Sequence, residues 1–272
     1  MTKANHEIML FAMKRYRLAV DDGVYFLRDI AANKYRSLFD CPFLGMLRAL
    51  QTKVVINLFF ETPAADFNLA AMPADYQSEW ADNAGWLRLA FHARHEFPSR
   101  PYATANAETL LRDYDDIAQE VQRFAGETVW SPTTVIHFCE LPATLLPALA
   151  SRGVQILSGM FIRNPQGNWV ANYGMDSAVS AAVAETGLAC DSRSGITFSR
   201  IDLILNNTPL AKICPALERL GSGRVLDLLT HEQYSWPFYQ RFLPDHTERL
   251  QTATRWCAEH GYESTFLHET RL

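Results

Sequence analysis

The sequence lacks any dense cluster of basic residues. No run of lysine and arginine exceeds two residues, and the formal net charge at pH 7 is −5. Proteins that bind nucleic acid need a basic patch against the phosphates, so we expect no nucleic-acid partner. Gly-rich phosphate loops of the P-loop or dinucleotide type are absent too, which excludes the common nucleotide-binding motifs.

Long hydrophobic runs are also missing. A membrane-spanning helix needs about 20 consecutive apolar residues, whereas the apolar stretch near the N-terminus covers only Ile8 to Met13 and is too short even for a signal peptide. The five cysteines show no C-x-x-C spacing, and their odd number fits free thiols in a reducing compartment. We therefore expect a cytoplasmic protein with no membrane partner.

The composition is that of one globular domain. Of the 272 residues, 48% are hydrophobic and 20% are charged, and single α/β barrels routinely contain roughly 200–250 residues. Short apolar runs alternate with helical patterns, as in successive strand–helix units. We predict a single domain, residues 1–272, folded as an irregular (β/α) barrel of about seven or eight parallel strands. The predicted strands are Tyr16 to Val20, Val54 to Phe60, Leu87 to Phe91, Thr134 to Phe138, Val154 to Met160, Ile201 to Leu205, Val225 to Leu229 and Ser264 to Leu267.

Helices are predicted between several of these strands. Apolar residues recur at helical spacing from Leu110 to Phe124, and Asn106 is placed to cap that helix. The same spacing recurs from Leu210 to Leu220, and a further helix is predicted from Pro244 to His260.

Ionisable residues follow several predicted strands at the point where each strand ends. Asp21 and Asp22 end the first strand, and His92 ends the third. His137 lies at the end of the fourth strand, and His231 follows the strand Val225 to Leu229. The carboxyl ends of parallel strands form the functional face of a barrel, so we expect these side chains to converge at its mouth.

Two carboxylates beside imidazoles are typical of a metal-dependent hydrolase, in which one carboxylate binds the cation and the other takes a proton from water. The spacing leaves open whether Asp21 or Asp22 is the ligand. His95 is either a second ligand beside His92 or part of an exposed loop. Asp-Asp-Gly is also common in turns, and single histidines near strand ends are often structural.

Other polar and aromatic residues near the mouth are candidates for substrate binding. They are Glu140, Glu232, Tyr234 and Trp236. The remaining histidines, His246, His260 and His268, are expected to be solvated.

Two of these segments resemble a known family. Leu18 to Gly23 is similar to the first motif of the polysaccharide deacetylases, the NodB-homology carbohydrate esterases, which is a hydrophobic strand ending in Asp-Asp-Gly. Leu228 to His231 resembles their last motif, an apolar strand ending in His. The resemblance implies an irregular (β/α) barrel in which Asp21 is the general base, Asp22 is a metal ligand and His231 is the general acid.

The middle motifs are more divergent. Phe91 to Pro98 resembles the second motif, but its two histidines are three residues apart instead of four, so His137 becomes a candidate second ligand. Val135 to Gly153 resembles the third motif without its Arg and Pro-Tyr, and His137 and Glu140 stand in that neighbourhood. Asp202 is the candidate for the fourth motif.

The resemblance implies a metal-dependent hydrolase that removes an acetyl group, or cleaves another C–N amide bond, on a carbohydrate or small-molecule substrate. The implied cofactor is a divalent metal, Zn²⁺, bound by Asp22, His92 and either His95 or His137. Two alternatives stay open: a barrel that binds a saccharide without turnover, and a metal hydrolase acting on a phosphoester or cyclic amide.

Overall fold

The computed structural model describes residues 14–62, 66–220 and 225–270, so the apolar stretch Ile8 to Met13 lies outside it. The helices of the described residues are α1 (Tyr25–Asn33), α2 (Pro42–Ala49), α3 (Gln77–Asn83), α4 (Ala107–Ala125), α5 (Leu146–Ser151), α6 (Ser177–Thr186), α7 (Leu210–Leu220) and α8 (His246–Glu259). The strands of the described residues are β1 (Lys14–Gly23), β2 (Val54–Phe59), β3 (Glu61–Thr62), β4 (Phe67–Asn68), β5 (Leu87–Ala93), β6 (Thr133–Thr134), β7 (Ile156–Gly159), β8 (Ile162–Arg163), β9 (Trp169–Val170), β10 (Leu188–Cys190), β11 (Thr197–Arg200), β12 (Leu203–Ile204), β13 (Val225–His231) and β14 (Tyr262–Ser264).

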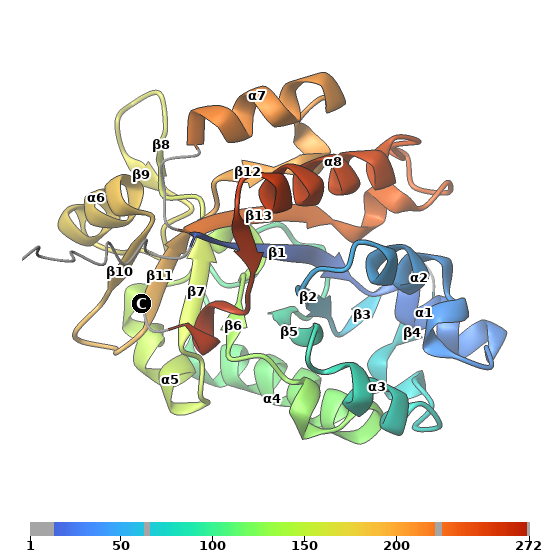
Figure 1. Ribbon diagram of the computed structural model, residues 1–272. Helices are drawn as coiled ribbons and strands as arrows, with labels where there is room; N and C mark the ends of the chain where they lie inside the picture. Colours follow the sequence, from blue (N-terminus) through green and yellow to red (C-terminus); the bar gives the residue numbers. More distant parts are fainter. Residues whose placement is uncertain (1–13, 63–65, 221–224, 271–272) are drawn as a thin grey trace, which may run out of the picture.

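A mainly parallel sheet forms the centre of the molecule. Its strands run in the order β12-β13-β1-β2-β5, and β14 also pairs with β1. A second sheet has the order β10-β11-β7-β6, in which only β10 is antiparallel. Helices α7 and α8 cover one side of the strands and α3, α4 and α5 cover the opposite side (Figure 1). The predicted α/β class is confirmed.

The strands of the described residues do not form one closed ladder, so the predicted barrel is not found as a continuous sheet. Between β5 and the second sheet there is a single bridge, from Leu89 to Trp130. Beyond this bridge, the backbone N–H and carbonyl of Val135 contact two side chains instead of a neighbouring strand. Asn57 Oδ1 accepts the Val135 N–H at 3.3 Å, and the His92 ring contacts the Val135 carbonyl oxygen.

A buried ion pair ties the two sheets together from inside. Arg17 of β1 is fully buried, and it donates to Asp227 of β13 at 2.8 Å and to Ser158 of β7 at 2.9 Å. Ser199 of β11 donates to the other oxygen of Asp227 at 2.8 Å. Each of these side chains comes from a different strand, so the pair fixes β1 and β13 against the second sheet.

Several strand predictions are confirmed and others are wrong in their limits. The predicted strands that begin at Tyr16, Val54, Leu87 and Val225 correspond to β1, β2, β5 and β13. The predicted strand Thr134 to Phe138 instead ends at Thr134, because the Val135 backbone groups contact the Asn57 and His92 side chains, and the chain then turns at Phe138 and Cys139, which have left-handed φ values of 63° and 54°.

The limits of two other predicted strands are also wrong. The final strand is Tyr262–Ser264 and is followed by a 3-10 turn from Leu267, and the predicted strand Ile201 to Leu205 is shortened to the two residues of β12, Leu203–Ile204. The helix patterns are confirmed as α4, α7 and α8, and the Asn106 side chain accepts from the Thr109 N–H at 2.9 Å as expected of an N-cap.

Bulges occur where β1 and β5 reach their ionisable residues. Between Val20 and Gly23, β1 contains one more residue than the facing part of β2, and Asp22 adopts a left-handed φ of 62°. On β5, His92 is the extra residue between two consecutive partners of β2. A regular strand would turn Asp21 and Asp22 to opposite faces, whereas the bulge lets both face the same side.

No helix within the described residues is long and apolar enough to cross a bilayer.

The close approach of β1 to β2 beside this bulge depends on Gly23. A Cβ at that position would lie 2.5 Å from Ile56 Cγ2 and 3.3 Å from the Asn57 carbonyl oxygen. We expect Gly23→Ala to lower the free energy of unfolding by about 1–3 kcal/mol, because the extra methyl overpacks a close contact. Urea denaturation measures this change. Gly85→Ala is the matched control, since a Cβ there meets nothing within 4 Å, and an equal loss in both variants would contradict the packing argument.

Candidate metal centre and cavity

A cavity of about 320 Å³ opens at the carboxyl ends of β1, β5 and β13. Five of the residues predicted from the strand ends line it. They are Asp21, Asp22, His92, His137 and His231. Residues far apart in the sequence therefore meet in one cavity, as the parallel strands predict.

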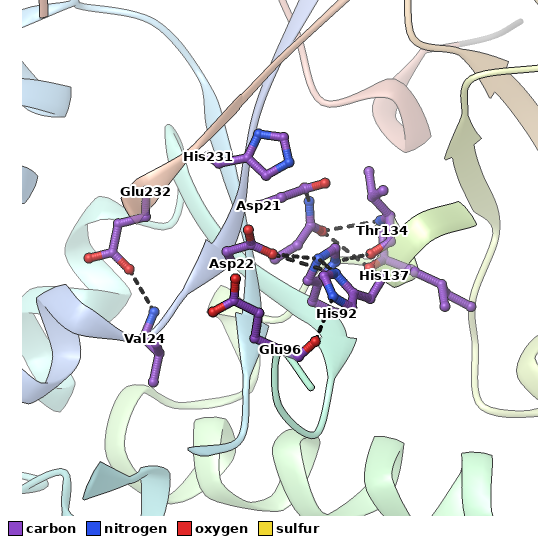
Figure 2. Close-up of polar contacts among 12 residues, drawn as sticks. Asp21, Asp22, Val24, His92, Glu96, Thr134, His137, His231 and Glu232 are labelled. Carbon is purple, nitrogen blue, oxygen red and sulfur yellow. Dashed lines mark hydrogen bonds and ion pairs between the residues drawn. The ribbon is translucent and has the colours of Figure 1, made fainter. Parts of the chain in front are cut away.

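Three of these side chains point toward one another (Figure 2). His92 Nε2 lies 3.1 Å from Asp22 Oδ1 and 3.1 Å from His137 Nδ1. His137 Nδ1 lies 3.6 Å from the same Asp22 oxygen. All three residues are buried, and one potential ligand atom from each lies within 4.8 Å of the others. The Asp22–His92–His137 cluster is therefore a candidate metal site.

The outer hydrogen bonds determine which ring nitrogens face the centre of the cluster. His92 Nδ1 contacts the Val135 carbonyl oxygen, and His137 Nε2 lies 3.2 Å from the Glu96 carbonyl oxygen. A carbonyl oxygen only accepts, so each of these nitrogens carries a hydrogen. When both rings are neutral, the other nitrogen of each ring, His92 Nε2 and His137 Nδ1, carries no hydrogen. These two nitrogens then point their lone pairs at each other and at the Asp22 carboxylate. The two lone pairs and the carboxylate repel one another unless a positive charge, either a proton or a metal cation, lies between them.

The pKa shifts agree with a single positive charge in the cluster. Burial and the neighbouring His92 lower the pKa of His137 to about 4. Burial alone would lower the pKa of His92, but the charges of Asp21 and Asp22 outweigh it and raise that pKa. Burial likewise opposes ionisation of Asp22, yet the hydrogen bond from His92 and the nearby imidazoles lower its pKa. Two histidines and one carboxylate leave a fourth position open in a tetrahedral zinc site.

Asp21 is held by an asparagine that the sequence analysis did not identify. Asn57 Nδ2 donates to Asp21 Oδ1 at 2.6 Å, and the Asn57 side-chain oxygen accepts from Thr134 and Val135. The signal was a single polar residue in the apolar strand β2. The second oxygen of Asp21 is left for the cavity, and burial raises the pKa of this carboxyl.

His231 faces the same cavity from β13, and its register partner on β1 is Asp21. Its Nδ1 lies 2.9 Å from Asn206 Oδ1, while Asn206 Nδ2 donates to Asn207. Asn206 thus accepts from Nδ1–H, which leaves His231 Nε2 without a hydrogen in the neutral ring. Nothing in the sequence pattern singled out Asn206.

Several predicted residues lie outside this cavity. His95 lines a smaller adjoining cavity with Glu61 and Thr62. Glu140 pairs with Arg100 at 3.4 Å and lines a separate hollow. Tyr234 does line the main cavity.

Two predictions about the other polar residues are wrong. Asp202 does not orient the site, because its carboxylate pairs with Arg200 at 2.6 Å and accepts the Asp227 N–H. His246 is buried instead of solvated, since its ring is hydrogen-bonded to Thr230 and Ser235. His260 is exposed as expected, and His268 is half-buried beside Thr133.

Glu232 and Trp236 do not line the main cavity but form a clamp behind it, in which Glu232 is buried and Trp236 is half-buried. The Glu232 carboxylate accepts the backbone N–H groups of Val24, Tyr25 and Phe26 at 2.6–2.9 Å, and the Trp236 indole N–H at 2.7 Å. It satisfies the first turn of α1, where no side chain of that segment caps the helix. Burial nonetheless raises the pKa of Glu232 to about 7. The clamp joins the end of β13 to the residues directly after Asp22.

Comparison with known proteins supports the fold. No protein-family model matches the chain, and no curated protein matches it. A 4-alpha-glucanotransferase from Thermococcus litoralis is 15% identical, with 94% of this chain and 40% of that chain covered and a TM-score of 0.57. A peptidoglycan N-acetylglucosamine deacetylase is 11% identical, with 94% and 86% covered and a TM-score of 0.51. A family 4 acetyl xylan esterase from Clostridium thermocellum, solved with a cobalt ion, is 12% identical, with 94% and 89% covered and a TM-score of 0.50.

These similarities are structural, because the identities lie between 11% and 15%. The resemblance to polysaccharide deacetylases expected from the sequence is therefore confirmed at the level of the fold. Since one similar structure is a glucanotransferase, the fold alone does not decide the reaction. Function must be argued from the site.

The cluster geometry generates a metal-binding prediction. We expect Asp22→Asn, His92→Ala and His137→Ala each to lower zinc affinity by more than the roughly 10–100-fold that loss of a supporting hydrogen bond costs. The thermal stability of Asp22→Asn should stay near that of the wild type, because residues at this face serve function more than packing. Elemental analysis and competition with a chelator measure the affinity. His95→Ala is the control; zinc loss there, with normal binding in His137→Ala, would contradict the assignment.

The Glu232 clamp generates a stability prediction. Glu232→Gln replaces one acceptor oxygen with an NH₂ group that faces N–H donors, so at least one buried donor loses its partner. We expect the free energy of unfolding to fall by about 1–3 kcal/mol, measured by urea denaturation. Glu259→Gln, at an exposed position at the end of α8, should change it by less than about 0.5 kcal/mol. Equal stability of the two variants would rule out the clamp.

Proposed function

We propose that this protein is a metal-dependent hydrolase that removes an acyl group from an amide nitrogen on a carbohydrate. The observation that carries the proposal is the convergence of three inward-facing lone pairs, from Asp22, His92 and His137, in the cavity that Asp21 and His231 also line. Two proteins of similar fold act on acetylated carbohydrates according to their names, a peptidoglycan N-acetylglucosamine deacetylase and an acetyl xylan esterase.

Asp22, His92 and His137 are the proposed ligands, and Zn²⁺ is the proposed cation because imidazole and carboxylate groups suit it. A bound divalent cation supplies Lewis-acid chemistry, polarising the amide carbonyl and making water easier to deprotonate. The hydrogen bonds from the two rings to the Val135 and Glu96 carbonyls orient the ligands.

Asp21 is the proposed general base. Its Oδ1 is occupied by the Asn57 amide, so Oδ2 is the atom that takes the proton from water. Asn57 keeps the carboxylate oriented, since its own oxygen is fixed by Thr134 and Val135. Attack of the oxygen on the amide carbon then forms the new C–O bond.

His231 is the proposed general acid. Asn206 fixes the ring through Nδ1–H, so Nε2 is the atom that holds the proton for the leaving nitrogen. When the C–N bond breaks, the amine leaves with that proton and the acyl group leaves as a carboxylate. Asp21 and His231 are register partners on the adjacent strands β1 and β13. The proposed base and acid therefore lie side by side in the wall of the cavity.

The rim of the cavity has side chains suited to a sugar. Tyr234, Tyr239 and the exposed Phe97 offer ring faces, while Glu96 and Gln233 offer hydrogen-bonding groups. Aromatic faces pack against the apolar face of a sugar, and the polar groups bind its hydroxyls.

The mechanism predicts a loss of turnover without loss of metal. We expect Asp21→Asn and His231→Gln each to lower kcat by about 10²–10⁴-fold on N-acetylglucosamine oligosaccharides, the range for loss of a general base or acid. Zinc content should be unchanged in both. Release of acetate, followed by an enzyme-coupled assay, measures kcat, and His260→Gln, which changes an exposed imidazole, is the control.

A panel of substrates assayed with the wild type tests the alternative functions. Saccharide binding with no hydrolysis by zinc-loaded wild type would identify a binding protein in place of an enzyme. Cleavage of p-nitrophenyl phosphate or of a cyclic imide, with N-acetyl sugars untouched, would identify another hydrolase on this fold.

A further inference from the structure

The main cavity is divided by polarity. Its rim contains Glu96, Ser99, Gln233, Tyr234 and Tyr239, along with the exposed rings of Phe97 and Phe138. The remaining apolar lining residues are here called the floor. The floor consists of Val135, Cys139, Met160, Ala171, Ile201, Ile204 and Leu229.

The floor lies deeper than the rim. Leu229 precedes His231 by two residues on β13, so both side chains point to the same face and Leu229 lies one step further into the molecule. Ile204 of β12 is its register partner. Leu229, Ile201 and Val135 are each at most 5% exposed, and Met160, Ala171 and Ile204 are half-buried. At the rim Gln233 is buried, whereas the rings of Phe97 and Phe138 are exposed.

The floor offers almost no hydrogen-bonding group. Its one polar side-chain group is the Cys139 thiol, which already faces the Ser158 carbonyl oxygen. A sugar ring placed there would lose the hydrogen bonds of its hydroxyls to water without replacement, which costs free energy for each buried hydroxyl. A hydrocarbon chain meets no such cost and gains from burial.

We propose that the floor binds the hydrocarbon chain of an acyl group longer than acetyl, so that the preferred substrates are butanoyl or hexanoyl amides of an amino sugar. This inference rests on the proposed function, because it places the scissile carbonyl between the metal cluster and Asp21. The amine-bearing sugar then lies at the polar rim and the chain lies over Leu229 and Ile204. A methyl group alone would leave most of the floor uncovered in a cavity of about 320 Å³.

A binding series tests the floor independently of turnover. Zinc-loaded Asp21→Asn protein is titrated by calorimetry with N-acetyl-, N-butanoyl- and N-hexanoylglucosamine. Each buried methylene is expected to tighten binding about fourfold, so the Kd should fall about 15-fold from acetyl to butanoyl. Affinity that is constant or weaker along the series, or no binding of any member, overturns the proposal.

Two matched variants test whether the gain in affinity with chain length comes from the floor. Ile204→Phe adds bulk at the floor and should abolish the gain with chain length. Ile162→Phe makes the same change at an exposed position on β8, outside the cavity, and should keep the gain. A full gain retained in Ile204→Phe overturns the assignment of the chain to the floor.

Turnover by the wild type separates the two proposals. Hydrolysis of the butanoyl and hexanoyl amides in preference to acetyl supports both. A binding gain without hydrolysis of any member leaves the floor supported and refutes the hydrolase. Hydrolysis of the acetyl amide alone, with no binding gain, refutes the floor and leaves the hydrolase standing.

Discussion

The site depends on three buried, electron-rich atoms that lie close together, one each from Asp22, His92 and His137. Asp22, His92 and His137 would repel one another without a positive charge between them, yet the carbonyl oxygens of Val135 and Glu96 hold both rings with their lone pairs inward. Such an arrangement is costly to form and has little structural purpose of its own. This is the arrangement that we propose as a preformed site for a cation.

The rest of the sheet is built around this constraint. β1 and β5 each contain an extra residue at the ligand position, and the chain leaves strand geometry just before His137. Val135 gives its N–H to Asn57 and its carbonyl to His92 instead of to a neighbouring strand. Between β5 and the second sheet, the Asn57 and His92 side chains thus bind backbone groups that would otherwise pair with a strand. Elsewhere the Arg17–Asp227 pair links β1 and β13, and the Glu232 clamp links the end of β13 to the start of α1.

Much of the strand order could be predicted from the sequence, because buried parallel strands read as short apolar runs and their polar ends stand out. Asp21, Asp22, His92 and His231 were found in this way. The bulges could not be predicted, since nothing in the local sequence shows that Asp22 adopts a left-handed φ or that β5 gains a residue at His92. The roles of Asn206 and Glu232 depend on partners more than 20 residues away, so only the folded chain reveals them.

X-ray absorption spectroscopy of the zinc-loaded protein identifies the atoms bound to the metal in the absence of a substrate, so it tests whether Asp22, His92 and His137 are the ligands. We expect one zinc ion per chain, with two imidazole ligands and oxygen ligands at about 2.0–2.2 Å. A sulfur ligand, or a shell with fewer than two imidazoles, would contradict the claim that Asp22, His92 and His137 form the metal site.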